Sequence, residues 1–297
     1  MSLAPRVVLV HRTTEYEELT ARHGTHGQAA FFLSSRGRDI AEVAERHRRA
    51  REALAAVVSA IPLTWRQARL ERADLDRFLF APEDVVVVVG QDGLVANVAK
   101  YLVGQPVVGI DADPGRNPGV LVRHRPQDAG ALLASAHGGS ADELTMVEAV
   151  ADDTQRLVAL NEIYLGAAGH QTARYRLGLD EYGGAVEPQA SSGVLVGTGT
   201  GATGWLRSVW QERGGGLPLP GPTDERLLWF VREAWPSPST GTSLVAGELT
   251  ASGRLSLTVE SDRLIVFGDG MEGDAVELMW GQTVRVGVAG VRLRLVG

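Results

Sequence analysis

The chain has 297 residues, a formal net charge of −7 and no cysteine. The acidic balance does not suggest a nucleic-acid-binding protein, and the lack of cysteine excludes a disulfide framework, a thiol nucleophile and a cysteine-ligated metal. No apolar run approaches the roughly 18 residues of a membrane-spanning helix. Met1–Pro5 shows no secretory signal, so we expect a cytoplasmic protein that binds neither nucleic acid nor membrane.

The basic residues exclude two classes of phosphate-binding protein. Lysine and arginine together number 29, and Lys100 is the one lysine. Lys100 stands in Val98-Ala99-Lys100-Tyr101, which does not fit the P-loop motif G-x-x-x-x-G-K-[ST]. The protein-kinase set of motifs is absent as well. Any phosphate chemistry must therefore use backbone amides, arginines and a metal ion.

The first 142 residues alternate apolar runs with helical patterns. Strands are predicted at 6–10, 84–89 and 106–110, and the five valines of the second suit a strand buried on both faces. Apolar residues at three- and four-residue steps predict a helix over about 38–59, and a second helix follows position 93 to about 103. Strand–helix–strand order predicts an α/β domain with a parallel sheet over residues 1–142.

From 143 to 297 the pattern changes to many short alternating strands with Gly and Pro between them. This pattern predicts a β-rich, sandwich-like second domain, and leaves open that its last strands return to the first domain. Segments 145–151 and 156–165 flank Asp152-Asp153 as a hairpin. Further strands are predicted at 173–179, 193–196, 227–232, 243–249, 254–260, 263–267, 283–288 and 291–296.

The first candidate site is Gly90-Gln91-Asp92-Gly93, directly after the most apolar strand. Ligands bind at this end of open α/β sheets, and a helix that starts here offers free N–H groups to a phosphate. Asp92 could act as a general base toward a hydroxyl or hold a metal-bound water. The alternative is a simple turn in which Asp92 caps the helix.

The second candidate is Asn161-Glu162, which interrupts an apolar strand-like run. Asn offers a donor and an acceptor to a base edge, and Glu accepts from sugar hydroxyls. An exposed strand end is the alternative.

The third candidate is the segment Ser191–Trp205, where a strand runs into a turn of glycines and threonines. Such a turn exposes backbone amides and hydroxyls to an anion, although it could also be decorative. Gly199–Gly204 fits G-x-G-x-x-G, but no parallel crossover is evident after it, so we do not interpret it as a Rossmann fingerprint. The candidate ligand-binding residues here are Thr198, Gly199, Thr200, Gly201, Thr203, Gly204 and Trp205.

In this order and roughly at these intervals, the three features resemble the NAD kinase family. That family has a Gly-Gly-Asp-Gly-Thr turn, an Asn-Glu pair and a Thr-x-Thr-Gly-Ser-Thr-Ala-Tyr-like turn. The resemblance covers about 84–297 and is closest to the mitochondrial-type branch. The features shared with that branch are 108–116, 159–163, 191–193 with 197–201, and 230–233.

The resemblance implies the fold of NAD kinases and diacylglycerol kinases. It also implies transfer of the terminal phosphate of ATP, or of polyphosphate, to the 2′-hydroxyl of the adenosine ribose of NAD, giving NADP. Mg²⁺ would arrive with ATP, and no residue of the chain is predicted as its ligand. Family members are commonly homo-oligomers, so a homodimer or larger assembly is expected.

The resemblance also implies roles for the candidate residues. Asp92 would take the proton of the ribose hydroxyl, with Gly90, Gln91 and Gly93 around it at the phosphates. Asn161 and Glu162 would hold the adenosine part of NAD. Thr198 to Trp205, together with Ser208, would line the dinucleotide pocket.

Two residues depart from the family pattern. Gln91 replaces a glycine, and Leu94 replaces a threonine. If that glycine needs a positive φ, Gln91 is strained by roughly 1–3 kcal/mol. These departures motivate one alternative, a catalytically weakened NAD(P)-binding protein of the same fold. A diacylglycerol-type lipid kinase, which shares the fold and the first turn, is another.

Overall fold

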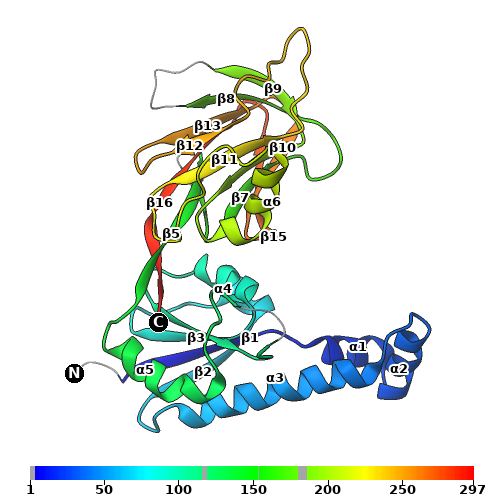
Figure 1. Cartoon of the computed structure of the whole chain (residues 1–297), viewed down its shortest axis with the longest axis vertical. Coiled ribbons are helices and arrows are strands. Elements are labelled where there is room, and N and C mark those ends of the chain that lie inside the picture. The colour runs from blue at the N-terminus through cyan, green and yellow to red at the C-terminus, as the bar shows by residue number, and fades with distance from the viewer. Residues whose placement is uncertain (1–3, 116–118, 153, 180–185) are drawn as a thin grey trace. The chain divides into compact units, whose positions relative to one another are not determined.

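The computed structural model describes residues 4–115, 119–152, 154–179 and 186–297 (Figure 1). Parts of the predicted loop at 111–119 and of the predicted hairpin turn at Asp152-Asp153 lie outside these ranges. The chain divides into two compact units. Unit 1 comprises Met1–Asp142 and Arg294–Gly297, and unit 2 comprises Glu143–Leu293.

Unit 1 is built on a parallel sheet with the strand order β2-β1-β3-β4. The last residues of β16 extend it, because Arg294 and Leu295 pair in parallel with Pro106 and Val107 of β4. The strands of this sheet are β1 (Arg6–His11), β2 (Arg66–Glu71), β3 (Asp84–Gly90) and β4 (Pro106–Asp111).

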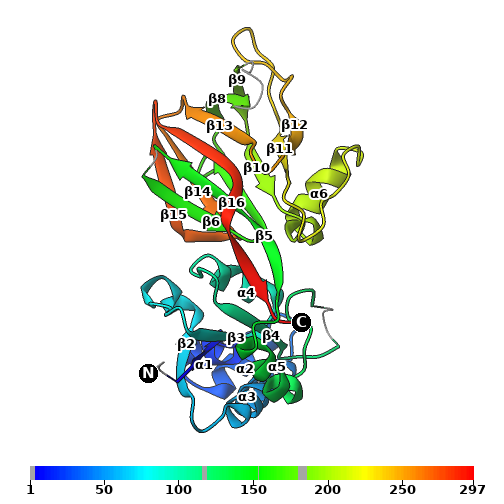
Figure 2. The same cartoon turned by 90° about the vertical axis from the view of Figure 1, so that its left-hand side faces the viewer.

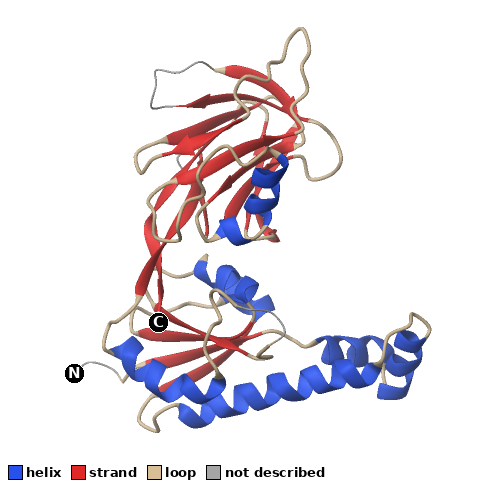
Figure 3. Cartoon of the chain, in the orientation of Figure 1, coloured by secondary structure: helices blue, strands red, loops and turns tan. Residues whose placement is uncertain are grey.

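Helices cover both faces of this sheet (Figure 3). Alternate valines of β3 explain why, since side chains of a strand point to opposite faces in turn. Val85, Val87 and Val89 share a core with α3 (Ile40–Ala60) and α5 (Ala129–His137). The short helix α4 (Asp92–Ala99) packs against β3 and β4 outside that core.

Two further helices, α1 (Glu15–His23) and α2 (His26–Ser34), pack on the first part of α3 around Leu19, Leu33 and Val43. Sequence analysis missed both. A signal was present, because Thr14 and the glutamate three residues later form a capping box at the start of α1.

Unit 2 contains two packed sheets. The first has the order β12-β11-β10-β7-β14-β15 and is antiparallel. Its strands are β7 (Glu162–Gly166), β10 (Gly193–Gly197), β11 (Leu227–Arg232), β12 (Ala246–Leu249), β14 (Arg263–Gly268) and β15 (Met271–Met279). The second sheet is formed by β5 (Asp142–Ala151), β6 (Gln155–Ala159), β8 (Ala173–Leu179), β9 (Glu187–Ser191), β13 (Arg254–Val259) and β16 (Thr283–Leu295).

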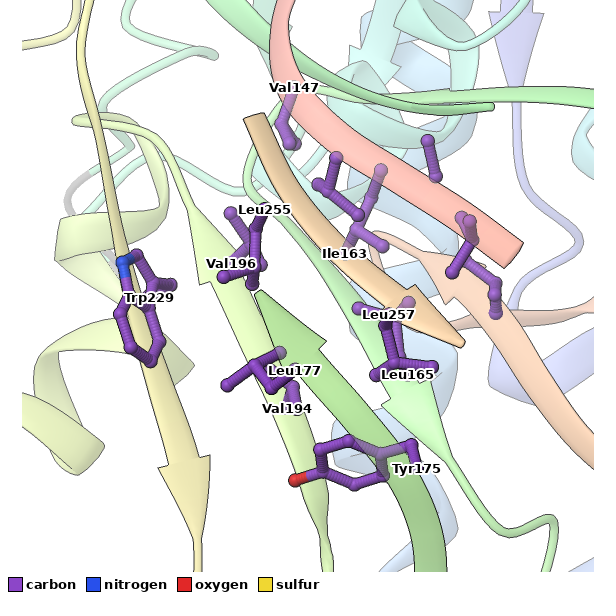
Figure 4. Close-up of a cluster of buried hydrophobic side chains, with 14 of the residues drawn as sticks. Val147, Ile163, Leu165, Tyr175, Leu177, Val194, Val196, Trp229, Leu255 and Leu257 are labelled. Carbon is purple, nitrogen blue, oxygen red and sulfur yellow. The ribbon is translucent and has the colours of Figure 1, made fainter. Parts of the chain in front are cut away.

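Alternation along the strands builds the core between these sheets (Figure 4). Ile163 and Leu165 of β7 face inward with Val194 and Val196 of β10, and they meet Leu177 of β8. The architecture is thus the predicted one, an α/β domain with a parallel sheet and a β-rich, sandwich-like region.

The outward-facing residues of the first sheet of unit 2 are covered by α6 (Trp205–Glu212) (Figure 2). Leu195 and Phe230 lie between the sheet and Leu206 and Val209 of this helix. The connection from β10 through α6 leads to β11, which pairs antiparallel with β10. A Rossmann crossover would need a parallel pair, so the G-x-G-x-x-G match is no such fingerprint.

Some predicted strand boundaries are wrong. The predicted strand 156–165 is two strands, β6 and β7, which are separated at Leu160-Asn161. The predicted pair 283–288 and 291–296 is the single strand β16, because Gly290 continues in extended conformation between apolar runs. Sequence analysis also missed β2, β9, β15, α5 and α6.

Candidate functional site

The turn Gly90–Gly93 joins β3 to α4 in unit 1. Gln91 is the N-cap of α4, with φ −124° and ψ 164°. This is ordinary extended backbone, so glutamine stands there without strain. The backbone therefore does not require a glycine at position 91, and this departure from the family pattern causes no strain.

The other departure in the same turn is Leu94, which has a packing role. Its side chain is buried, and its Cδ2 atom would lie 3.2 Å from a Cβ on Gly90. Leu94 therefore packs beneath the turn. In contrast, a Cβ on Gly93 would have nothing within 4 Å. The start of α4 is thus open at Gly93, and a helix N-terminus with open space beside it can receive an anion.

Asp92 is held by backbone amides of a distant segment. Its Oδ2 accepts from the amide of Val120 at 2.8 Å, and its Oδ1 accepts from Leu121 and Val122, both at 2.9 Å. The alternative, that Asp92 caps the helix, is wrong, because Gln91 is the N-cap and the Asp92 carboxylate accepts from residues 120–122 instead. Three of roughly four acceptor positions of the carboxylate are then used.

The segment that Asp92 holds is also pressed against β4. A Cβ on Gly109 would lie 1.9 Å from the carbonyl oxygen of Leu121. Only glycine allows this close approach. Asp92 and Gly109 together fix residues 120–122, so Asp92 has an anchoring role whatever its chemistry.

In unit 2 the second and third sequence features come together. The hydroxyl of Thr198 donates to the carbonyl oxygen of Leu160 at 2.6 Å, and its amide donates to that of Asn161 at 2.9 Å. The same hydroxyl accepts from the amides of Thr200 and Gly201 at 3.1 and 3.3 Å. One buried hydroxyl therefore joins the Thr-Gly turn to the Asn-Glu pair.

The glycines of this turn are needed for close approach. A Cβ on Gly201 would lie 2.3 Å from the carbonyl oxygen of Asn161, and a Cβ on Gly199 would lie 2.0 Å from that of Gly221. Neither glycine has a positive φ. The turn is thus packed between two other backbone segments.

Besides Thr198, two more polar side chains are buried in this assembly. Glu162 is 9% exposed, and burial, with a smaller contribution from the charge of Asp269, raises its pKa to about 8. The hydroxyl of Thr200 is buried and has no hydrogen-bond partner among the described residues. A buried polar atom without a partner is costly, so a ligand atom that paired with it would be favoured.

The start of α6 adds an aromatic surface. Trp205 stacks on Tyr164, with 5.6 Å between ring centroids, and the guanidinium of Arg232 lies 5.6 Å from the Trp205 ring. The Tyr164 hydroxyl donates to the carbonyl oxygen of Ser192 at 2.6 Å, which fixes the ring below Trp205. The partly exposed indole is a stacking surface for a planar group.

The structure therefore groups the predicted residues in two places. Gly90–Gly93 lie in unit 1, and all the others lie in unit 2. Within unit 2, Asn161, Glu162 and Thr198–Gly201 share one hydrogen-bonded assembly. The exposed members, which lie at or on α6, are Thr203, Gly204 and Ser208.

Sequence analysis missed Asp269, which follows β14. Its carboxylate accepts from the amides of Leu160 and Asn161 at 2.8 and 2.7 Å. The Gly-Asp-Gly sequence at 268–270 indicates a turn, but nothing local indicates a partner more than one hundred residues earlier.

Among the described residues, no group of three or more His, Asp or Glu side chains is placed to hold a metal ion. No helix in the described ranges is both long and apolar enough to cross a membrane.

No family model matches the chain, and no curated protein matches it. Among solved structures, an NAD kinase from Archaeoglobus fulgidus, crystallised in complex with ATP, is similar to it with a TM-score of 0.60. The two chains are 18% identical, and the match covers 98% of this chain and 93% of the other. Both units are thus matched, and the chain has the fold of an NAD kinase.

Proposed function

We propose that the chain is a phosphotransferase of the NAD kinase type, which transfers the terminal phosphate of ATP or polyphosphate to the 2′-hydroxyl of the adenosine ribose of NAD. One observation carries this proposal: Asn161-Glu162 and Thr198–Gly201, 37 residues apart, form a single assembly with buried polar groups. The order of the three sequence features and the shared fold support it.

The assembly in unit 2 suits the adenosine part of NAD. The Asn161 carboxamide offers both a donor and an acceptor to a base edge. Glu162, with its pKa of about 8, is mostly neutral at pH 7. A neutral carboxyl can exchange hydrogen bonds with ribose hydroxyls without repelling the phosphates of the dinucleotide. The hydroxyl of Thr200 is a further partner for a polar ligand atom.

The turn in unit 1 suits the transfer step. Asp92 accepts the proton of the 2′-hydroxyl on the acceptor position that the amides of 120–122 leave free. The hydroxyl oxygen then bonds to the terminal phosphorus of ATP while the bond to ADP breaks. Mg²⁺ would enter with ATP as part of the substrate, and the open start of α4 at Gly93 leaves room for phosphate oxygens beside the helix N-terminus.

The sequence features shared with the mitochondrial-type branch support that branch within this proposal. They include Ser191-Ser192-Gly193, in which the carbonyl oxygen of Ser192 anchors Tyr164 and the side chain of Ser191 is buried.

The test is direct. Purified protein is incubated with NAD, ATP and Mg²⁺, and NADP is measured by chromatography. Parallel samples replace ATP with polyphosphate, NAD with NADH (product NADPH), or NAD with a diacylglycerol (product a phosphorylated lipid). We expect NADP with at least one donor and no phosphorylated lipid. Absence of NADP with every donor would refute the proposal.

A second candidate is a protein of the same fold that binds NAD(P) with little turnover. The three amides on the Asp92 carboxylate favour it, because they occupy most of its acceptor positions with hydrogen bonds that anchor residues 120–122. NAD binding in calorimetry without NADP formation would identify this function.

A further inference from the structure

Asp269 occupies the tight turn between β14 and β15 with a φ of 54°. Its Oδ2 accepts from the amide of Leu160 at 2.8 Å, and its Oδ1 accepts from the amides of Asn161 and Glu162 at 2.7 and 3.4 Å. In return, the Asp269 amide donates to the carbonyl oxygen of Glu162 at 3.1 Å. These hydrogen bonds hold residues 160–162 and the turn at Asp269 against each other, and we call this arrangement the clamp.

This clamp explains the break between β6 and β7. Successive amides of a strand point in alternate directions, whereas three successive amides converge here on one carboxylate. Converging amides form a concave anion site, a nest, and Asp269 supplies its anion. The strand must therefore stop at Leu160-Asn161 and restart at Glu162.

The break also has a consequence for binding. With the amides of 160–162 turned to Asp269, the carbonyl oxygens of Leu160 and Asn161 accept from Thr198. The backbone between the clamp and the Thr-Gly turn is thus held from both sides. Asn161 and Glu162 project from this fixed backbone.

We propose that Asp269 is a positioning residue for the dinucleotide site: it holds Asn161 and Glu162 in the geometry that receives the adenosine of NAD. This inference rests on the proposed function. Asp269 itself has no contact with the ligand in it.

The charge of Asp269 also acts on Glu162. Burial raises the pKa of Glu162 to about 8, and the negative charge of Asp269 contributes to the rise. Of the described elements packed on Glu162, β10 carries no titratable group. Arg156 of β6 and Arg263 of β14 each pair with a carboxylate of the adjacent strand. The charge of Asp269 therefore adds to the larger effect of burial on Glu162.

The test compares Asp269→Asn with Asp152→Asn. Asparagine tolerates a positive φ, so the backbone of each turn is kept. Asp152 is a matched control in the same unit: it has a φ of 47°, and its carboxylate accepts from Gln282 and from the amide of Thr283 at 2.5 and 3.0 Å. NAD affinity of the full chain is measured by calorimetry from pH 6 to 9.5.

At pH 6, well below the pKa of about 8 of Glu162 in the wild type, we expect Asp269→Asn to bind NAD about tenfold more weakly than wild type, because the clamp is impaired. Wild-type affinity should fall as the pH passes about 8. In Asp269→Asn the fall should begin at lower pH, because the neighbouring charge is gone. Asp152→Asn should match wild type in both respects.

An Asp269→Asn protein that matches Asp152→Asn in affinity and pH profile overturns this inference alone. A wild-type protein that does not bind NAD overturns the proposed function and this inference with it. Hydrogen exchange of the amides of 160–162, faster in Asp269→Asn than in wild type, verifies that the variant has loosened the clamp.

Discussion

In both units an aspartate carboxylate accepts hydrogen bonds from three successive backbone amides of a distant segment. In unit 1, Asp92 gathers the amides of 120–122, and in unit 2, Asp269 gathers those of 160–162. Asp92 lies in the turn whose sequence pattern indicates catalysis, whereas Asp269 lies in an unremarked hairpin turn. Because both carboxylates accept from three successive backbone amides, these hydrogen bonds alone do not show whether a carboxylate reacts or only positions other residues.

The largest expected effect separates reaction from anchoring at Asp92. In the proposed mechanism, Asp92→Asn removes the proton acceptor, so kcat for NADP formation should fall by about 10²–10⁴-fold. Hydrogen exchange at Val120–Val122 should rise as well, because the amide group offers one acceptor oxygen where the carboxylate has two. Exchange that rises while kcat stays within threefold of wild type would leave Asp92 as an anchor only.

Alanine substitution of one glycine in each unit compares a closely packed position with an open one. Gly201→Ala should lower the free energy of unfolding by about 2–4 kcal/mol, because its Cβ would lie 2.3 Å from the Asn161 carbonyl oxygen. Gly93→Ala, with nothing within 4 Å, should change stability by less than about 1 kcal/mol. Urea denaturation measures both. Equal losses would contradict the close contact at Gly201.

The stability of the wild type should depend on pH differently from that of Glu162→Gln, whose side chain is always neutral. Its pKa is raised above the unfolded value, so its stabilising contribution is full below about pH 4.5 and is lost progressively up to about pH 8. Glu162→Gln should thus be more stable than wild type at pH 8.5, by on the order of 3 kcal/mol, with little difference at pH 4. Denaturant melts at the two pH values test this, and a constant difference between the proteins would disprove the raised pKa.

The smallest effect is expected for Gln91→Gly, which restores the residue of the family pattern. Because Gln91 has extended backbone angles, no strain is relieved, and stability should fall by about 0.5–1 kcal/mol from the added freedom of glycine. The rate of NADP formation should stay within threefold of wild type. A large gain in rate would show that the glutamine side chain obstructs the site.

The elements of the fold that follow from local pattern were predictable. The valine run of β3 and the periodicity of α3 specify buried strand and amphipathic helix directly. What local pattern misses depends on distant partners. The segment 156–165 has continuous strand character, yet it breaks because of a carboxylate 109 residues away from Leu160.

The candidate site shows the same limit. Sequence identifies Asp92, the Asn-Glu pair and the Thr-Gly turn as unusual, but not that the hydroxyl of Thr198 joins the last two. The departures at Gln91 and Leu94 were also undecidable from sequence. Their meaning depends on a φ angle and on which way a side chain is buried.

The parallel sheet of unit 1 has a consequence for biosynthesis. Its edge at β4 is completed by Arg294 and Leu295, and the amide of Val296 donates to the carbonyl oxygen of Val107. A ribosome delivers these residues about 150 positions after the rest of unit 1 has emerged. Until then the nascent sheet has an exposed edge, which invites mispairing. Completion of this sheet therefore waits for translation of residues 294–296, and a chain terminated before them lacks the pairing partner of β4.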